Sequence, residues 1–170
     1  MIRYPVAREK AASVLGMFDA NEAPVNVIAI AEKLGFKVVP FSFPDTMSAV
    51  VRIYEDGEKV IGVNKDQTPT RQRFSIAHEL GHYLCGHESY SHDQIVIDPS
   101  KKYLDPGFQM EQEADEFAAE LLMPSYLLSR DMESEGPLFV ERLAKKYDVS
   151  EQALWIQILN VQSFASAESF

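Results

Sequence analysis

The pattern of apolar and polar positions changes along the chain from helical to extended and back to helical. We expect helices over six segments, which are 5–18, 24–34, 68–86, 109–123, 138–147 and 150–161. We expect strands over three segments, which are 36–41, 48–54 and 59–64. The last two strands flank Asp56-Gly57, a dipeptide typical of hairpin turns, so the small sheet should be mostly antiparallel. This order of elements predicts an α+β fold in which the sheet packs against several helices.

Turn-forming residues indicate how these elements are connected. Thr68 precedes a proline, which is a typical start for the third helix. Residues 88–108 contain two prolines and few periodic apolar positions, which predicts a long loop or lid beside a functional site. We therefore expect a single domain over residues 1–163, with an N-terminal helix within 1–20, and a C-terminal tail over 164–170.

Composition narrows the class of protein. The 170 residues are 46% hydrophobic, enough for a substantial core without disulfides. The formal net charge of −10 argues against binding to nucleic acid, because such binding depends largely on Lys and Arg. Cys85 is the only cysteine, and the first ten residues carry charges where a secretory signal would be apolar. No apolar run approaches the roughly 20 residues needed to cross a bilayer. We expect a cytoplasmic protein that does not bind membranes.

All four histidines lie within fifteen residues, at positions 78, 82, 87 and 92. The segment His78-Glu79-Leu80-Gly81-His82 matches the HExxH pattern of zinc hydrolases. On a helix, the two motif histidines lie one turn apart and about 40° apart around the axis, so both imidazoles can reach one ion. Glu79 lies on the same side, close enough to act on the attacking water without binding the metal. The motif therefore predicts a zinc hydrolase with Glu79 as its catalytic base.

A zinc hydrolase needs a third protein ligand and keeps one open position. The segment 109–123 supplies candidates, because small and apolar residues along one side allow this helix to pack closely on its neighbour. Glu111 and Asp115 are one turn apart on that side. We expect Glu111 to bind the metal and Asp115 to accept the N–H of a ligating histidine. Glu113 points roughly 200° away from Glu111 and is the alternative third ligand.

Two segments resemble the ImmA/IrrE metallopeptidases: Arg71 to His82, which contains the zinc motif, and Glu111 to Pro124, with the pattern Glu-x-x-Ala-Asp-x-Phe-Ala-Ala-x-Leu-Leu-Met-Pro. Shorter similarities lie at 24–25, 31–35 and 143–150 and extend the resemblance over roughly residues 24–159.

The resemblance implies a compact, gluzincin-like zinc peptidase domain. It assigns zinc to His78, His82 and Glu111, and catalysis to Glu79. Known members typically cut a helix-turn-helix transcriptional repressor, which implies a regulatory protein as substrate. The acidic surface suits a basic partner of this kind.

A second hypothesis is a non-proteolytic module that keeps the zinc fold and sequesters a protein partner. The intact Glu79 favours the peptidase. Residues 138–160 resemble a helix-turn-helix, but 150–170 contain neither Lys nor Arg, so we do not expect this helix pair to read DNA.

A peptidase also needs a group that stabilises the oxyanion. The sequence does not choose among five candidates, which are His87, Tyr90, His92, Tyr103 and Tyr126. For Arg71 and Arg73 we expect a packing role, as partners of the acidic helix or the hairpin. For Cys85 we expect a buried thiol.

Overall fold

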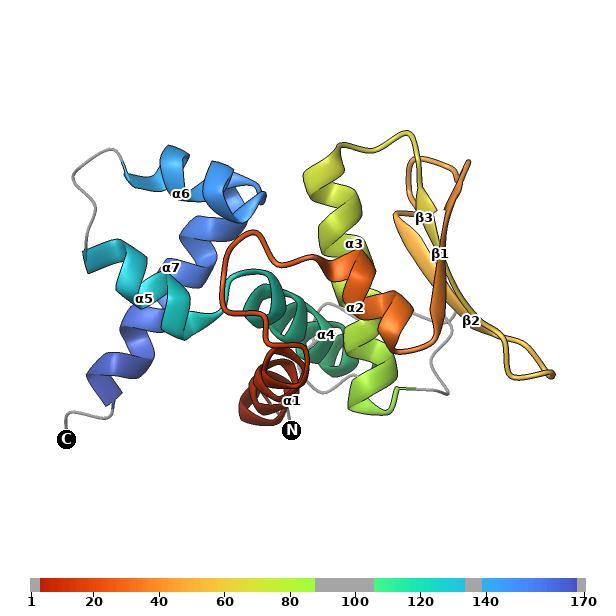
Figure 1. Ribbon diagram of the computed structural model, residues 1–170, viewed down its shortest axis with the longest axis horizontal. Helices are drawn as coiled ribbons and strands as arrows, with labels where there is room; N and C mark the ends of the chain where they lie inside the picture. The colour runs from red at the N-terminus through yellow and green to blue at the C-terminus, as the bar shows by residue number, and fades with distance from the viewer. Residues whose placement is uncertain (1–3, 88–105, 134–138, 168–170) are drawn as a thin grey trace.

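The computed structural model describes residues 4–87, 106–133 and 139–167. This part of the chain forms seven helices and a three-stranded sheet, which confirms the expected single α+β domain (Figure 1). The elements are α1 (Tyr4–Met17), α2 (Val27–Lys33), β1 (Phe36–Phe41), β2 (Ala49–Ile53), β3 (Lys59–Asn64), α3 (Pro69–Cys85), α4 (Pro106–Leu122), α5 (Ser125–Glu133), α6 (Phe139–Tyr147) and α7 (Glu151–Ala167). Of the loop expected over 88–108, residues 88–105 lie outside the described part and the remainder begins α4.

The sheet is mixed, with strand order β1-β3-β2. The expected hairpin joins β2 to β3 in an antiparallel pair, and its turn is closed by the bond from the N–H of Tyr54 to the carbonyl of Glu58 at 2.8 Å. The pairing of β1 with β3 is parallel. The reason is the connection over 42–48, which carries the chain past the end of the central strand to the far edge before the hairpin returns it. As a result, β2 is an edge strand.

Helix α3 lies between the sheet and α4, and it contacts both (Figure 1). Its start is capped by Thr68, whose side-chain oxygen accepts from the N–H of Arg71 at 3.4 Å. It ends at Gly86, whose φ of 79° lies in the left-handed region that favours glycine. Gly81 faces α4 so closely that an added Cβ would lie 3.0 Å from the Cα and the carbonyl oxygen of Ala114. The absence of a side chain at Gly81 therefore sets the distance between the two helices.

The C-terminal helices include one that the sequence pattern did not predict, namely α5, which begins directly after Pro124. The Glu120 carboxylate accepts from the N–H of Ser125 at 2.9 Å and from the side-chain amide of Gln157 on α7 at 3.2 Å. A second buried carboxylate, Asp131, accepts from the hydroxyl of Tyr147 on α6 at 2.8 Å. These contacts join the last helices to α4. Helix α7 continues to Ala167, so helical structure extends into the segment expected as a tail.

Arg73 connects α3 to the rest of the domain. Its guanidinium donates to the carbonyl of Val25 at 2.9 Å and to that of Asp148 at 3.1 Å, and it pairs with the Asp148 carboxylate at 3.2 Å. This is a packing role, although the partner is the α6–α7 connection rather than the acidic helix or the hairpin. Within the described ranges, no helix has the length and apolar character that crossing a bilayer requires.

Candidate metal centre

Three side chains from α3 and α4 converge on one point. The Nε2 atoms of His78 and His82 lie 3.0 Å apart. The two carboxylate oxygens of Glu111 lie 3.3 Å from the Nε2 of His78 and 3.2 Å from the Nε2 of His82. One ligand atom from each residue falls within 4.8 Å of the others. Two imidazole nitrogens and one carboxylate are a donor set that suits zinc and related divalent ions.

The structure brings Glu111, and not the alternative Glu113, to the histidine pair. Glu113 is buried, with 4% of its surface exposed, and its carboxylate lies 3.2 Å from the Nε2 of His87. The two glutamates therefore occupy different environments on the same helix. His87, which is not part of the HExxH motif, is also buried. The other histidine outside the motif, His92, lies outside the described residues.

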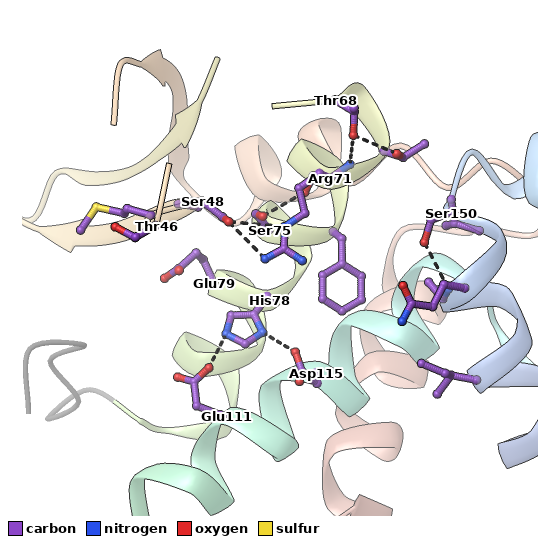
Figure 2. Close-up of a pocket in the computed structure, with 18 residues that line it drawn as sticks. Thr46, Ser48, Thr68, Arg71, Ser75, His78, Glu79, Glu111, Asp115 and Ser150 are labelled. Carbon is purple, nitrogen blue, oxygen red and sulfur yellow. Dashed lines mark hydrogen bonds and ion pairs between the residues drawn. The ribbon is translucent and has the colours of Figure 1, made fainter. Parts of the chain in front are cut away.

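Asp115 lies behind His78, at 2.9 Å from its Nδ1 (Figure 2). With a metal ion bound, a proton on Nδ1 would be donated to this carboxylate, and the Nε2 lone pair would face the ion. Burial lowers the pKa of His78, but the hydrogen bonds with Asp115 and Glu111 outweigh this and raise it to about 10. Burial acts against ionisation of Glu111 as well, yet hydrogen bonds from both histidines hold its pKa well below its usual range. Such an electron-rich group of atoms fits a cation in place of the proton.

Glu79 stands beside these ligand atoms and is not one of the three. Its side chain is buried, with 3% exposure, and one carboxylate oxygen accepts from the backbone N–H of Val51 on β2 at 3.1 Å. The edge strand therefore fixes the orientation of the carboxylate. Figure 2 shows Glu79 on the side of the pocket that faces β2, next to His78.

An open cleft of about 900 Å³ contains His78, Glu79, Glu111 and Asp115. One wall is the segment 46–49 before and at the start of β2, and the opposite wall is formed by residues 149–156 at the start of α7. The helix α3 forms the floor between them. His78, Glu79, Glu111 and Asp115 are therefore reached from outside through this cleft.

Arg71 also lines this cleft, a location that the sequence analysis did not predict. Its Nη2 donates to the hydroxyl of Ser48 at 3.1 Å, and its Nε donates to the same oxygen at 3.3 Å (Figure 2). It is the only Lys or Arg among the residues that line the cleft in the described part of the chain. Ser48 begins the segment 48–54, expected as the first strand of the hairpin, so this contact agrees with the packing role expected from sequence.

The oxyanion candidates are only partly placed. Tyr126 donates its hydroxyl to the carbonyl of Ala20 at 2.9 Å and does not line the cleft. His87 lies behind His82 and does not line the cleft either. Tyr90, His92 and Tyr103 lie outside the described residues. Cys85 is buried, as expected.

Comparison with known proteins supports the interpretation of this centre. The model of a peptidase family, described as the IrrE N-terminal-like domain, matches residues 31–158. The chain belongs to this family. The matched range runs from α2 into α7 and contains His78, His82 and Glu111. Membership confirms the resemblance to the ImmA/IrrE metallopeptidases, and a metallopeptidase family implies a bound metal ion.

Two relatives carry the name radiation response metalloprotease IrrE. The one from Deinococcus deserti is 33% identical over 103 residues, which cover 57% of this chain and 34% of the relative. The one from Deinococcus radiodurans is 31% identical over 103 residues, which cover 57% of this chain and 30% of the relative. The matched segment thus spans about a third of the length of these relatives.

A solved structure, titled Mycobacterium tuberculosis transcriptional regulator, shares the fold. It aligns with a TM-score of 0.58 and 19% identity over 85% of this chain and 44% of that chain.

Proposed function

We propose that this family member is a zinc-dependent endopeptidase that hydrolyses a peptide bond in a regulatory protein. The observation that carries the proposal is the position of Glu79, a buried carboxylate fixed by the N–H of Val51 beside the group of His78, His82 and Glu111. The open cleft in which these side chains lie supports a peptide chain as the substrate. The names of the two metalloprotease relatives support the same reaction.

In this proposal His78, His82 and Glu111 hold the zinc ion, and Asp115 orients His78 through its Nδ1. A bound zinc ion supplies Lewis acidity, which polarises the scissile carbonyl and lowers the pKa of the attacking water. The ligand set has one carboxylate and two neutral imidazoles, so the loaded site keeps a net positive charge. The proposed catalytic unit is the domain over residues 1–163, located in the cytoplasm.

Glu79 acts as the general base and then as the general acid. Its carboxylate takes a proton from the attacking water and passes that proton to the amine of the leaving peptide. The N–H of Val51 holds one carboxylate oxygen, which keeps the group in a fixed orientation through both transfers. Because Glu79 is 3% exposed, little bulk water competes for the proton.

We propose a helix-turn-helix transcriptional repressor as the substrate. The net charge of −10 favours association with a basic protein, and DNA-binding repressors are basic on the surface that contacts phosphate. The absence of Lys and Arg from 150–170 speaks against direct binding of nucleic acid by this chain. The repressor would then reach the cleft as a protein partner and not through a shared DNA site.

The proposal is tested by incubating the zinc-loaded protein with purified candidate repressors and mapping the fragments by mass spectrometry. The proposal predicts one or a few discrete cuts, which stop when a chelator removes the metal and return when zinc is added. A stable complex that yields no fragments would instead support the sequestering module.

A further inference from the structure

Behind His82 lies a second buried pair, His87 and Glu113, that the proposed chemistry does not use. Their exposed fractions are 5% and 4%. Gly86 ends α3 in the left-handed conformation and turns the chain back, so that the N–H of His87 donates to the carbonyl of His82 at 2.9 Å. This turn places the ring of His87 against the ring of His82, with centroids 5.1 Å apart.

The three side chains form a continuous chain of hydrogen bonds. The Nδ1 of His82 lies 3.0 Å from the Nδ1 of His87. The Nε2 of His87 lies 3.2 Å from a carboxylate oxygen of Glu113. This series of hydrogen bonds therefore begins at Glu113 on α4 and ends at the Nδ1 of His82. The other ring nitrogen of His82, Nε2, faces His78 and Glu111.

The direction of these hydrogen bonds follows from the chemistry of neutral imidazole, which has one N–H and one acceptor nitrogen. If the Nε2 of His82 binds metal, its proton is on Nδ1 and is donated to the Nδ1 of His87. The proton of His87 is then on Nε2, and the Glu113 carboxylate accepts it. The reverse direction would put the proton of His82 on Nε2 and block the ligand atom.

We propose that His87 and Glu113 are positioning residues that fix the tautomer and the ring orientation of His82 as a metal ligand. This inference rests on the metal centre of the proposed function. Both ligating histidines are then backed by a carboxylate, since Asp115 contacts His78 directly and Glu113 reaches His82 through an imidazole. Partners of this kind orient a ligating ring and raise its basicity.

The test is the zinc dissociation constant, measured by competition with a chromophoric chelator, together with the free energy of unfolding of the metal-free protein. Glu113→Leu and His87→Leu remove the hydrogen bonds at similar volume, and each should weaken zinc binding about 10- to 100-fold. Glu113→Gln keeps an oxygen that accepts from His87, so its zinc binding should lie nearer to wild type. The double variant should be no weaker than His87→Leu alone, because both changes interrupt the same chain.

Glu120→Leu is the matched control. Glu120 is another buried carboxylate of α4, with 6% exposure, but its partners are Ser125 and Gln157. This variant should lower the free energy of unfolding and leave zinc binding unchanged. The positioning role is overturned if Glu113→Leu folds and binds zinc within about twofold of wild type, so that its whole effect is on stability. If wild type itself binds no zinc, the proposed metal centre fails instead.

A measurement on the unmodified protein tests the same point without any variant. Long-range proton–nitrogen NMR spectra of the imidazole rings in the zinc-loaded protein report which nitrogen of each ring carries the proton. The proposal predicts His82 protonated on Nδ1 and His87 protonated on Nε2 with a bare Nδ1. A proton on the Nδ1 of His87 overturns it.

Discussion

Replacing Gly81 by alanine perturbs the packing on which the metal centre depends. Gly81 lies between the two motif histidines in sequence, and it faces Ala114 and Phe117 on α4. The same helix, α4, carries Glu111 and Asp115. A side chain added at Gly81 therefore pushes the two proposed ligands on α3 away from the proposed third ligand on α4.

The cost can be worked from the distances. An added Cβ would lie 3.0 Å from two backbone atoms of Ala114 and 3.2 Å from the Cβ of Phe117, whereas ordinary contact begins at 3.4 Å. These neighbours are fully buried, so they yield only if the helix itself shifts. Overpacking of this kind costs about 1–3 kcal/mol, and the better helix propensity of alanine returns about 1 kcal/mol. We expect a net loss of about 1 kcal/mol, which lowers Tm by roughly 2–4 °C.

The assay is thermal unfolding of Gly81→Ala, first without metal and then after zinc is added. The Tm values are compared with those of wild type and of Gly16→Ala. Gly16 is a helical glycine in the last turn of α1, and an added Cβ there meets nothing within 4 Å. Gly16→Ala should be neutral or stabilising by up to about 1 kcal/mol. Gly81→Ala should destabilise the protein and also weaken zinc binding, because ligand distances tolerate shifts of only about 0.2 Å. Equal stabilisation by both substitutions would refute this account of the α3–α4 contact.

Three further predictions concern Asp115, Arg71 and Asp131. Asp115→Ala should weaken zinc binding about 10- to 100-fold in chelator competition, because His78 loses the acceptor for its Nδ1 proton. Arg71→Ala should raise KM and largely keep kcat in steady-state assays, because its guanidinium lines the cleft and contacts Ser48 instead of the ligand group; a loss confined to kcat would contradict this. Burial raises the pKa of Asp131, but hydrogen bonds from Lys146 and Tyr147 outweigh it and hold that pKa below its ordinary value. Its ionised form therefore stabilises the fold above about pH 4, and this contribution is lost as the pH falls through the folded-state pKa. Asp131→Asn should lower the free energy of unfolding at neutral pH by about 1.5–3 kcal/mol and flatten its decline in acid, as measured by urea unfolding across pH.

Elements with local signals could be predicted closely from the sequence. Helix α3 begins after Thr68 and ends before Gly86, as expected, because a capping hydroxyl, a proline and a left-handed glycine act within one turn of each end. Strands β1 and β3 match the segments 36–41 and 59–64 for a similar reason, since each is a short extended run bounded by turn residues.

Features that depend on distant contacts could not be predicted. Helix α5 has nine residues and is held by Glu120 and by the contact of Asp131 with Tyr147, none of which leaves a periodic pattern. The parallel pairing of β1 with β3 depends on the path of the connecting segment. In the same way, the sequence places His87 near the motif, but only the left-handed turn at Gly86 and the approach of α4 bring it between His82 and Glu113.

The central claim is that Glu79 performs the proton transfers of peptide hydrolysis beside a metal that it does not bind. Glu79→Gln keeps the shape of the side chain and the bond from Val51, and removes the base. The direct measurement is zinc content per chain together with the rate of cleavage of a mapped substrate. The account predicts one zinc ion per chain in both proteins and a cleavage rate about 10²–10⁴-fold lower, or undetectable, in the variant. Cleavage at the wild-type rate by zinc-loaded Glu79→Gln protein would contradict it.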